Sequence, residues 1–145
     1  MAASVCLKVA SRAAKREVKI TMTLAKQFTP AGVKNTIVRE DVEKLDVRVG
    51  TIERVDAVEK SDKLLKLAVN FGDHARQILV GMKGERANPA KEIVGKQALF
   101  VINLKPKTMA GQISEGMLFD IGYSDGLTPV LAVPEKFVPN GSRAG

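Results

Sequence analysis

A succession of short apolar runs, each ended by turn residues, most constrains what this chain of 145 residues can fold into. In the clearest run, alternate residues from Leu65 to Phe71 are apolar, while Lys66 and Asn70 stand between them. Alternation with a period of two is the pattern of a half-buried β-strand, and the Gly-Asp-His-Ala sequence at 72–75 predicts the turn that ends it. Apolar runs that predict further strands occupy residues 47–58, 76–82, 96–103, 116–122 and 129–134.

The first of these runs changes phase near Gly50. Val47 and Val49 have one parity, whereas Ile52 and Val58 have the other. A glycine inside a strand often marks a bulge or a sharp bend. We therefore expect this strand to bend at Gly50 and to serve two sides of a barrel.

Helix signals are few and short. Asn88 can cap a helix, Pro89 suits the first helical position and Gly95 suits the end. Together they predict a helix of one or two turns between the third and fourth strands. Another short helix is predicted at 39–46, where apolar residues recur at helical spacing.

The first five of these strands, a bend in the first and a small helix between the third and fourth predict an all-β fold with short helices. The arrangement that fits them is a five-stranded oligonucleotide/oligosaccharide-binding barrel, or OB-fold. The pattern is also compatible with another small barrel or with a β-sandwich, because it gives the number of strands but not their order.

The positive charge of the chain is concentrated before the strands. The formal net charge is +7, and residues 1–35, with seven Lys or Arg and one acidic residue, account for +6 of it. Residues 36–145 carry sixteen basic and fifteen acidic residues, so a barrel that binds a polyanion must gather its lysines on one face. We therefore predict two parts, a basic, disordered N-terminal extension at 1–35 and the barrel at 36–145.

The extension has three open interpretations. Its Ala, Ser, Lys and Arg content is typical of a transit peptide, but it also suits a disordered basic arm, or an upstream start codon with Met22 as the true first residue. We expect a cytoplasmic protein, or an organellar one if residues 1–21 direct import. No apolar run approaches the ~20 residues of a membrane span, so no membrane partner is expected.

Residues able to support catalysis are sparse. Cys6 lies outside the predicted barrel and His74 falls in a turn, and each is the only residue of its type. The glycines in the sequence Gly-Met-Lys-Gly-Glu-Arg at 81–86 are not followed by the Lys-Ser/Thr of a phosphate loop, and no Cys/His cluster is present to hold zinc. The sequence therefore predicts a binding module with no active site, no metal and no cofactor.

The most informative stretch is Leu-Lys-Pro-Lys-Thr-Met-Ala-Gly-Gln-Ile-Ser-Glu-Gly-Met-Leu-Phe at 104–119, between the fourth and fifth strands. Pro106 restricts the backbone around Lys105 and Lys107, so their ammonium groups would lose less entropy on meeting phosphates. Ser114 offers a hydroxyl to a phosphate or a ribose 2′-OH, and Met117 offers an adaptable apolar contact. Lys-Pro-Lys also suits a merely solvated turn, and Met117 also suits the core.

Together with the preceding Asn103, this stretch resembles the hallmark of the tRNA-binding domain family. The usual form is roughly Asn-Leu-Lys-Pro-Arg/Lys-x-Met/Leu-x-Gly-x-x-Ser-x-Gly-Met, and every fixed position is filled from Asn103 to Met117. Other blocks that resemble the family lie at 44–52, 61–67, 92–96 and 138–143. The family includes the C-terminal appendage of many methionyl-tRNA synthetases, the endothelial monocyte-activating polypeptide and free-standing structure-specific tRNA-binding proteins.

The resemblance implies an OB-fold that binds tRNA by its shape and phosphate backbone, without catalysis. It also implies a symmetric homodimer joined through the chain ends, with an aminoacyl-tRNA synthetase as a further partner. The candidate tRNA contacts that it implies are Asn103, Lys105, Lys107, Ser114 and Met117, with Lys63 and Arg48 as additional candidates.

The sequence departs from the family pattern in two places. Where many members have His-Pro, this chain has Glu59-Lys60-Ser61, and residues 81–90 lack the aromatic residues common there, so base stacking is expected to contribute little. A second interpretation stays open: a sister group with the same barrel resembles secretion-related chaperones that bind unfolded peptide, and Val-Asn-Phe-Gly at 69–72 is similar to that group. A pure dimerisation or assembly module is a third.

Overall fold

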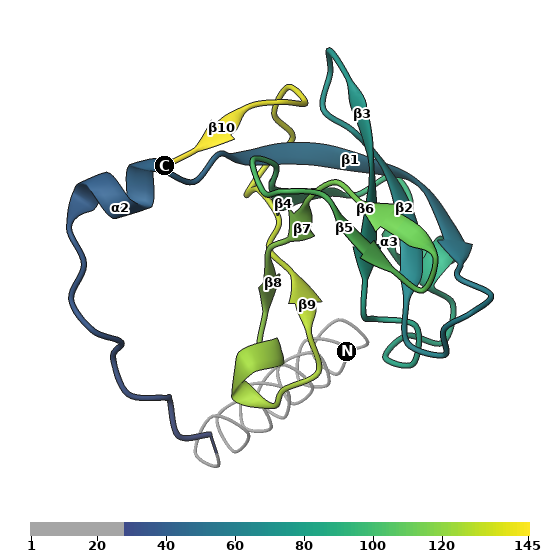
Figure 1. The fold of residues 1–145 in the computed structure, drawn as a ribbon, viewed down its shortest axis with the longest axis horizontal. Coiled ribbons are helices and arrows are strands. Elements are labelled where there is room, and N and C mark those ends of the chain that lie inside the picture. The colour runs from purple at the N-terminus through teal and green to yellow at the C-terminus, as the bar shows by residue number, and fades with distance from the viewer. Residues whose placement is uncertain (1–27) are drawn as a thin grey trace, which may run out of the picture. The chain divides into compact units, whose positions relative to one another are not determined.

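The computed structural model describes residues 28–145, and the predictions for the part of the extension before residue 28 lie outside the described residues. Thr36–Gly145 forms a compact unit of its own (Figure 1). Its elements, in chain order, are α2 (Arg39–Glu43), β1 (Val47–Ala57), β2 (Leu65–Asn70), β3 (Ala75–Val80), α3 (Pro89–Ile93), β4 (Gln97–Val101), β5 (Lys107–Met109), β6 (Gln112–Ser114), β7 (Met117–Leu118), β8 (Asp120–Ile121), a 3-10 turn η1 (Tyr123–Asp125), β9 (Val130–Leu131) and β10 (Arg143–Ala144). Neither α-helix in this part of the chain has the length and apolar content needed to cross a membrane.

The main sheet is antiparallel and curled (Figure 1). Its strands follow the order β3-β2-β1-β4-β7, and β10 pairs with the start of β1. Two further strand pairs, β5 with β6 and β8 with β9, form separate hairpins. This mostly β architecture, with a curled sheet and α3 between β3 and β4, confirms the predicted OB-like barrel with short helices.

β1 serves two sides of the barrel, as predicted. Its residues 47–51 pair with β4, and its residues 51–57 pair with β2. The irregularity in the pairing lies between Ile52 and Arg54, close to Gly50, near which the change of phase was predicted. Gly50 is needed for another reason, since a Cβ there would lie 2.5 Å from Val69 Cγ1 and 2.8 Å from Phe71 Cε1. The missing side chain lets two core residues pack directly against β1.

The alternation predicted for β2 fills the core. Leu65, Leu67 and Val69 are buried, while the residues between them are half-buried. Phe71, which follows β2, packs edge-to-face against Phe100 of β4 with ring centroids 5.6 Å apart, and both side chains are fully buried. Burial of an apolar side chain of this size contributes about 1.5–3 kcal/mol, so this row of residues is a main source of the barrel's stability.

Both predicted short helices are present. Asn88 Oδ1 accepts a hydrogen bond from Lys91 N at 3.1 Å, Pro89 takes the first helical position, and Gly95 follows the helix with a φ of +84°. The cap and the stop therefore act as predicted from the sequence. α3 contributes Ile93 to the core cluster, whereas α2 buries no residue.

The predicted fifth strand at 116–122 is divided in two. Its first part, β7, pairs with β4, whereas β8 pairs with β9. Phe119 lies between the two parts and donates its N–H to Leu99 O at 2.9 Å, while Leu99 N donates to Ala132 O at 3.0 Å. The strand changes partner at this point, and the β8–β9 hairpin projects away from the main sheet (Figure 1).

The barrel is closed beside β3 by side chains rather than by a regular ladder of backbone hydrogen bonds. Gln77 N donates to the Glu115 carboxylate at 2.9 Å, and Glu115 N donates to Gln77 O at 2.8 Å. Leu79 N donates to Ser114 Oγ at 3.0 Å. A free strand edge leaves backbone N–H groups unpaired, so Ser114 and Glu115 satisfy the edge of β3 and attach the β5–β6 hairpin to it.

Gly116 lies where this closing segment passes closest to the barrel. A Cβ there would lie 2.9 Å from Val101 O, a backbone atom, and 3.2 Å from Ile78 Cδ1. We expect Gly116→Ala to lower the free energy of unfolding by about 1–3 kcal/mol, because overpacking a core has a cost of that order. Urea denaturation measures this change. Gly84→Ala is the matched control, since a Cβ on Gly84 meets nothing within 4 Å, and equal stability of the two variants would contradict the tight passage.

Candidate nucleic-acid interface

The β5–β6 hairpin carries the central part of the predicted binding stretch. Its two strands pair in register, and Ala110 and Gly111 form the two-residue turn between them. Both turn residues have positive φ, +49° and +76°, as a type I′ hairpin turn requires. Ala110 adopts this conformation against the preference of an L-residue, at a cost of roughly 1–2 kcal/mol. The conformation of the tip is therefore imposed by the surrounding structure.

Ser114 lies inside the closure of the barrel. Its side chain is 4% exposed, and its hydroxyl accepts from Leu79 N and donates to Gly116 O, both at 3.0 Å. In this structure the hydroxyl therefore has a structural role, and its predicted contact with a phosphate or a ribose stays a prediction.

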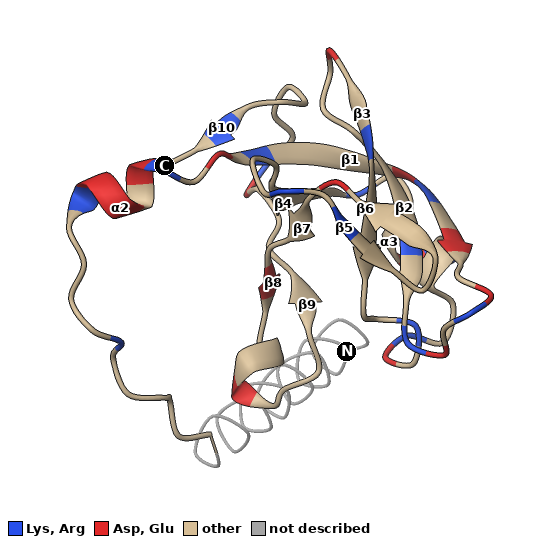
Figure 2. Ribbon diagram, viewed as in Figure 1, with Lys and Arg blue, Asp and Glu red and all other residues tan. Residues whose placement is uncertain are grey.

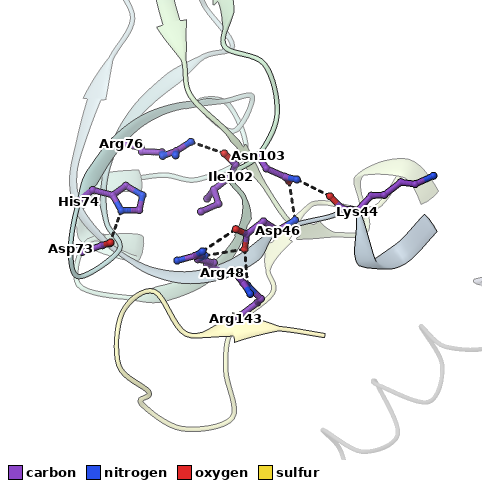
Figure 3. Close-up of polar contacts among 9 residues, drawn as sticks. All are labelled: Lys44, Asp46, Arg48, Asp73, His74, Arg76, Ile102, Asn103 and Arg143. Atoms are coloured by element: carbon purple, nitrogen blue, oxygen red, sulfur yellow. Dashed lines mark hydrogen bonds and ion pairs between the residues drawn. The ribbon is translucent and has the colours of Figure 1, made fainter. Parts of the chain in front are cut away.

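Asn103 ties the start of β1 to the end of β4. Its Oδ1 accepts from Asp46 N at 2.9 Å, and its Nδ2 donates to Lys44 O at 2.7 Å (Figure 3). Ile102 N reinforces this tie by donating to Asp46 O at 2.9 Å. Both ends of the Asn103 amide are engaged within the chain, so this exposed residue has a positioning role, and its predicted contact with tRNA stays a prediction.

Arg48 is held by an acidic neighbour. Its Nε and Nη2 donate to the two oxygens of Asp46 at 2.9 and 3.0 Å, and Arg143 Nε donates to the same carboxylate at 3.2 Å (Figure 3). The hydrogen bond from Arg48 is the main reason why the pKa of Asp46 is lowered. A guanidinium that already forms a two-pronged ion pair is a poor partner for a phosphate, so Arg48 belongs to the frame that joins β1 to β10.

Besides Asn103, which is also exposed, four of the predicted contacts lie at the surface. Lys105, Lys107 and Lys63 are exposed, and Met117, which opens β7, is 47% exposed. None of the three lysines forms an ion pair within residues 28–145. Lys107 begins β5, whereas Lys105 lies two residues earlier, before the strand.

Two hollows that the sequence did not predict lie beside the hairpin. One, of about 350 Å³, lies between the hairpin tip and the loop after β1, and Lys60, Lys66 and Gln112 line it. The other, of about 220 Å³, shares Lys66 and is also lined by Arg54 and Arg76. Figure 2 shows basic residues on β5 and on the loop after β1, where acidic residues are mixed with them. The alternation of β2 was the available signal, since it places Lys66 on the outward side of that strand.

His74 has a structural setting. Its ring stacks on Phe71 with centroids 5.4 Å apart, and its Nδ1 lies 2.6 Å from Asp73 Oδ1, a contact that lowers the pKa of Asp73 (Figure 3). Among residues 28–145, no group of three or more His, Cys, Asp or Glu side chains is placed to hold a metal ion.

Comparison with known families assigns the barrel. A family model described as "Putative tRNA binding domain" matches residues 47–143, which run from β1 to β10. The chain belongs to the tRNA-binding domain family. The matched residues include the hairpin stretch and the first strand on which the sequence resemblance rested.

Individual relatives agree with this assignment. The chain is 39% identical over 102 residues to methionine–tRNA ligase of Methanocaldococcus jannaschii, a match that covers 70% of this chain and 15% of that protein. It is 38% identical over 119 residues to methionine–tRNA ligase of Chlorobium chlorochromatii, covering 82% and 16%. The match thus spans less than a fifth of the length of these curated relatives.

Solved structures resemble the whole barrel. A MetRS-related protein from Pyrococcus horikoshii has a TM-score of 0.70 and 30% identity, with 77% of this chain and 100% of that chain covered. The chaperone CsaA from Bacillus anthracis has a TM-score of 0.68 and 27% identity, with the same coverage. The similar structures therefore include a MetRS-related protein and a chaperone.

The Asp46 network generates a test by pH. Because the pKa of Asp46 lies below its ordinary value of 3.8, its ionised form stabilises the fold fully above that pH, and this stabilisation is lost as the pH falls through the lowered pKa. We expect Asp46→Asn to lower the free energy of unfolding at pH 7 by about 1–2 kcal/mol and to reduce the loss of stability between pH 4 and pH 2. Urea denaturation across pH measures both effects.

The control is Asp62→Asn, at an exposed loop carboxylate without an ion pair among the described residues. It should change neither the free energy of unfolding at pH 7 nor its loss at low pH. Identical behaviour of the two variants would contradict the role of Asp46.

Proposed function

We propose that this chain is a non-catalytic RNA-binding module that binds tRNA by its shape and phosphate backbone. The observation that carries the proposal is the pair Lys105 and Lys107, which stand exposed and without an ion pair in residues 28–145. They belong to the stretch that identifies the family, and the hairpin that follows is fixed to the barrel through Ser114. Lys63 and Met117 extend the proposed contact surface.

The attachment of the hairpin favours binding to a rigid polyanion. Lys107 begins β5, whose partner strand β6 ends at the buried Ser114, and Pro106 restricts the backbone on its other side. An ammonium group held on such a segment loses less conformational entropy on binding than one on a free loop. Each phosphate contact also releases counterions from the RNA, which supplies affinity that falls with salt.

Base stacking has little part in this proposal. Phe71 and Phe100 are buried in the core, and the exposed aromatic residues Phe119, Tyr123 and Phe137 follow the hairpin instead of lying within it. The net charge of +1 on residues 36–145 also limits the affinity of the barrel alone. We propose that the basic residues of the extension at 1–35 add electrostatic attraction to the same tRNA.

We propose a homodimer as the form that binds, with the β8–β9 hairpin as the contact between copies. Large apolar side chains on and around this hairpin are exposed by 43–67%: Phe119, Ile121, Tyr123, Leu127 and Val130. A two-fold contact uses the same patch on both copies, and covering this patch would remove a large apolar area from water. Two basic surfaces in one particle would raise avidity for tRNA without new contacts.

Within a cell, such a dimer would work in the cytoplasm, beside an aminoacyl-tRNA synthetase, or in an organelle if residues 1–21 direct import.

Peptide binding is the second candidate, because two CsaA chaperones resemble the barrel, with TM-scores of 0.68 and 0.66. The exposed apolar side chains near β8 and β9 suit an unfolded peptide as well as a second copy. A competition experiment distinguishes the two functions. The chain is bound to labelled tRNA, and unlabelled tRNA or unfolded polypeptide is added as competitor. Unlabelled tRNA is the stronger competitor if the chain is a tRNA-binding module, and the polypeptide is the stronger competitor if it is a chaperone.

The loop lysines provide the direct test of tRNA binding. We expect Lys105→Ala and Lys107→Ala each to weaken tRNA binding and to reduce the slope of log Kd against log salt by about 0.7–0.9 for each phosphate that is no longer neutralised. Fluorescence anisotropy with labelled tRNA at several salt concentrations measures both quantities. Lys91→Ala, at an exposed lysine of α3, is the control and should leave them unchanged. Binding as tight as that of the parent chain in both loop variants would show that this segment is not the site.

The dimer has a separate test. Sedimentation equilibrium should give twice the chain mass of 15.6 kDa, and Ile121→Lys should shift the mass toward one chain, since it places a charge in the proposed contact. Thr128→Lys, which adds the same charge at an exposed polar residue between η1 and β9, is the control for charge alone. A parent chain that sediments as a monomer at all concentrations would end this part of the proposal.

A further inference from the structure

Lys60 helps to form the cleft between the hairpin tip and the loop after β1. Lys60 stands in the Glu59-Lys60-Ser61 sequence, and its side chain reaches from that loop to the tip. Its Nζ lies 3.9 Å from the place where a Cβ on Gly111 would stand. The absence of a side chain at Gly111 therefore leaves this edge of the 350 Å³ cleft open.

The charge of the cleft is not balanced within the described chain. Lys60 and Lys66 both line it, and neither forms an ion pair within residues 28–145. Asp56 stands opposite Lys66 in the strand register, but its carboxylate already accepts from Arg54 Nε at 2.8 Å. The hollow is thus lined by two lysines and by a single acidic residue, Glu59.

We propose that this cleft binds a single unpaired ribonucleotide of an RNA chain, an assignment that rests on the proposed function and makes its ligand more specific. The phosphate lies between the ammonium groups of Lys60 and Lys66. The Glu59 carboxylate accepts hydrogen bonds from the ribose hydroxyls, and the Gln112 amide meets the edge of the base. A volume of about 350 Å³ suits one nucleotide and is too small for a base pair.

The role of Glu59 follows from the chemistry of ribose. A carboxylate accepts hydrogen bonds and donates none when ionised, so beside a nucleotide it pairs with hydroxyl groups and not with phosphate oxygens. The 2′-hydroxyl is the group by which a protein distinguishes RNA from DNA at a given nucleotide. Glu59 therefore makes the cleft selective for ribose, while the two lysines bind phosphate of either nucleic acid.

The surrounding structure prepares the cleft for binding. The tip is held with Ala110 at a φ of +49°, and a strained conformation of this kind persists only where the surrounding structure imposes it. The second hollow, which shares Lys66, continues the surface toward Arg54 and Arg76. Arg76 is fixed there by hydrogen bonds from its Nη1 to Ile102 O at 2.6 Å and Glu115 O at 3.0 Å. Because Arg54 is paired with Asp56 and Arg76 donates to two carbonyl groups, the phosphate contacts in this proposal come from Lys60 and Lys66 alone.

A titration of the full chain followed by amide chemical shifts tests the site without tRNA. The probes are uridine 3′,5′-bisphosphate, its 2′-deoxy analogue and inorganic phosphate. We expect the ribonucleotide to shift the amide signals of Lys60, Gly111 and Gln112, with the deoxy analogue about ten-fold weaker because it lacks a hydrogen bond to a charged group. No shifts at these residues, or equal affinity for the ribonucleotide and inorganic phosphate, would overturn the proposal.

Variants divide the site into its two parts. Lys60→Ala and Lys66→Ala should weaken both nucleotides at least several-fold, whereas Glu59→Gln should bring the ribo and deoxy forms to similar affinity. Lys91→Ala is the control, and an unchanged amide spectrum outside the cleft verifies the fold of each variant. Unchanged ribose preference in Glu59→Gln, or unchanged affinity in both lysine variants, would overturn the proposal.

The failure of this site differs from the failure of the proposed function. If the lysine variants at 60 and 66 leave nucleotide and tRNA binding intact while Lys105→Ala and Lys107→Ala weaken tRNA binding, the cleft assignment is wrong and the tRNA-binding function stands. If the parent chain binds the ribonucleotide in the cleft but does not bind tRNA, the proposed function is wrong and the nucleotide site stands.

Discussion

The closure of the barrel on the edge of β3 is the interaction on which the other features depend. A sheet that curls but does not complete a regular ladder leaves donors free along its last strand. Here the donors of Gln77 and Leu79 are taken by the side chains of Glu115 and Ser114. Side chains reach farther than backbone carbonyls do, so the chain closes the barrel while β5 and β6 form their own hairpin. A backbone ladder along the same edge would have required those residues to lie within the sheet.

This closure explains why one stretch of sequence contains both anchoring residues and the contacts proposed for tRNA. Ser114 and Gly116 are needed to bring the segment against the barrel, and Asn103 fixes the other end of the same segment to the start of β1. Lys105 and Lys107 lie between these attachments and remain exposed. Since the segment is anchored on both sides, its lysines are positioned by the fold. A family pattern that mixes anchors with contacts is thus what a short binding segment of this kind requires.

The sequence predicted features that depend on local chemistry. The period of two in β2, the Asn88 cap and the single helix between β3 and β4 follow from side-chain type and spacing, and they appear as predicted. The irregularity in β1 lies near Gly50, as predicted. The close approach of Val69 and Phe71 to Gly50 was not predicted, because a glycine in a strand can mark either a bend or a close neighbour. The division of the fifth strand depends on Leu99 bonding to two other segments through its O and N–H, which no local pattern contains. The internal partners of Ser114 and Asn103 could not be predicted for the same reason, since both partners lie in segments distant in sequence. The interaction of Arg48 was missed because its ion pair with Asp46 competes with an external partner.

The barrel has a surface with exposed lysines and another with exposed apolar side chains. They are separate because the chain changes its pairing partner after β7, from β4 to β9. While the chain remains in the main sheet, one side of each strand is committed to the core. At Phe119 the chain leaves β4 and forms a two-stranded hairpin with β9, and a two-stranded hairpin has no core of its own to bury apolar side chains. Ile121 and Val130 are directly paired across it and are both more than half exposed. Isolated hairpins are marginally stable in water, so a hairpin with this composition is stabilised when a second surface covers it. The lysine-bearing segment has the opposite requirement, because its charges act on a polyanion only while they remain accessible to it. The fold meets both requirements by placing the two hairpins on either side of β7, the short strand that connects them.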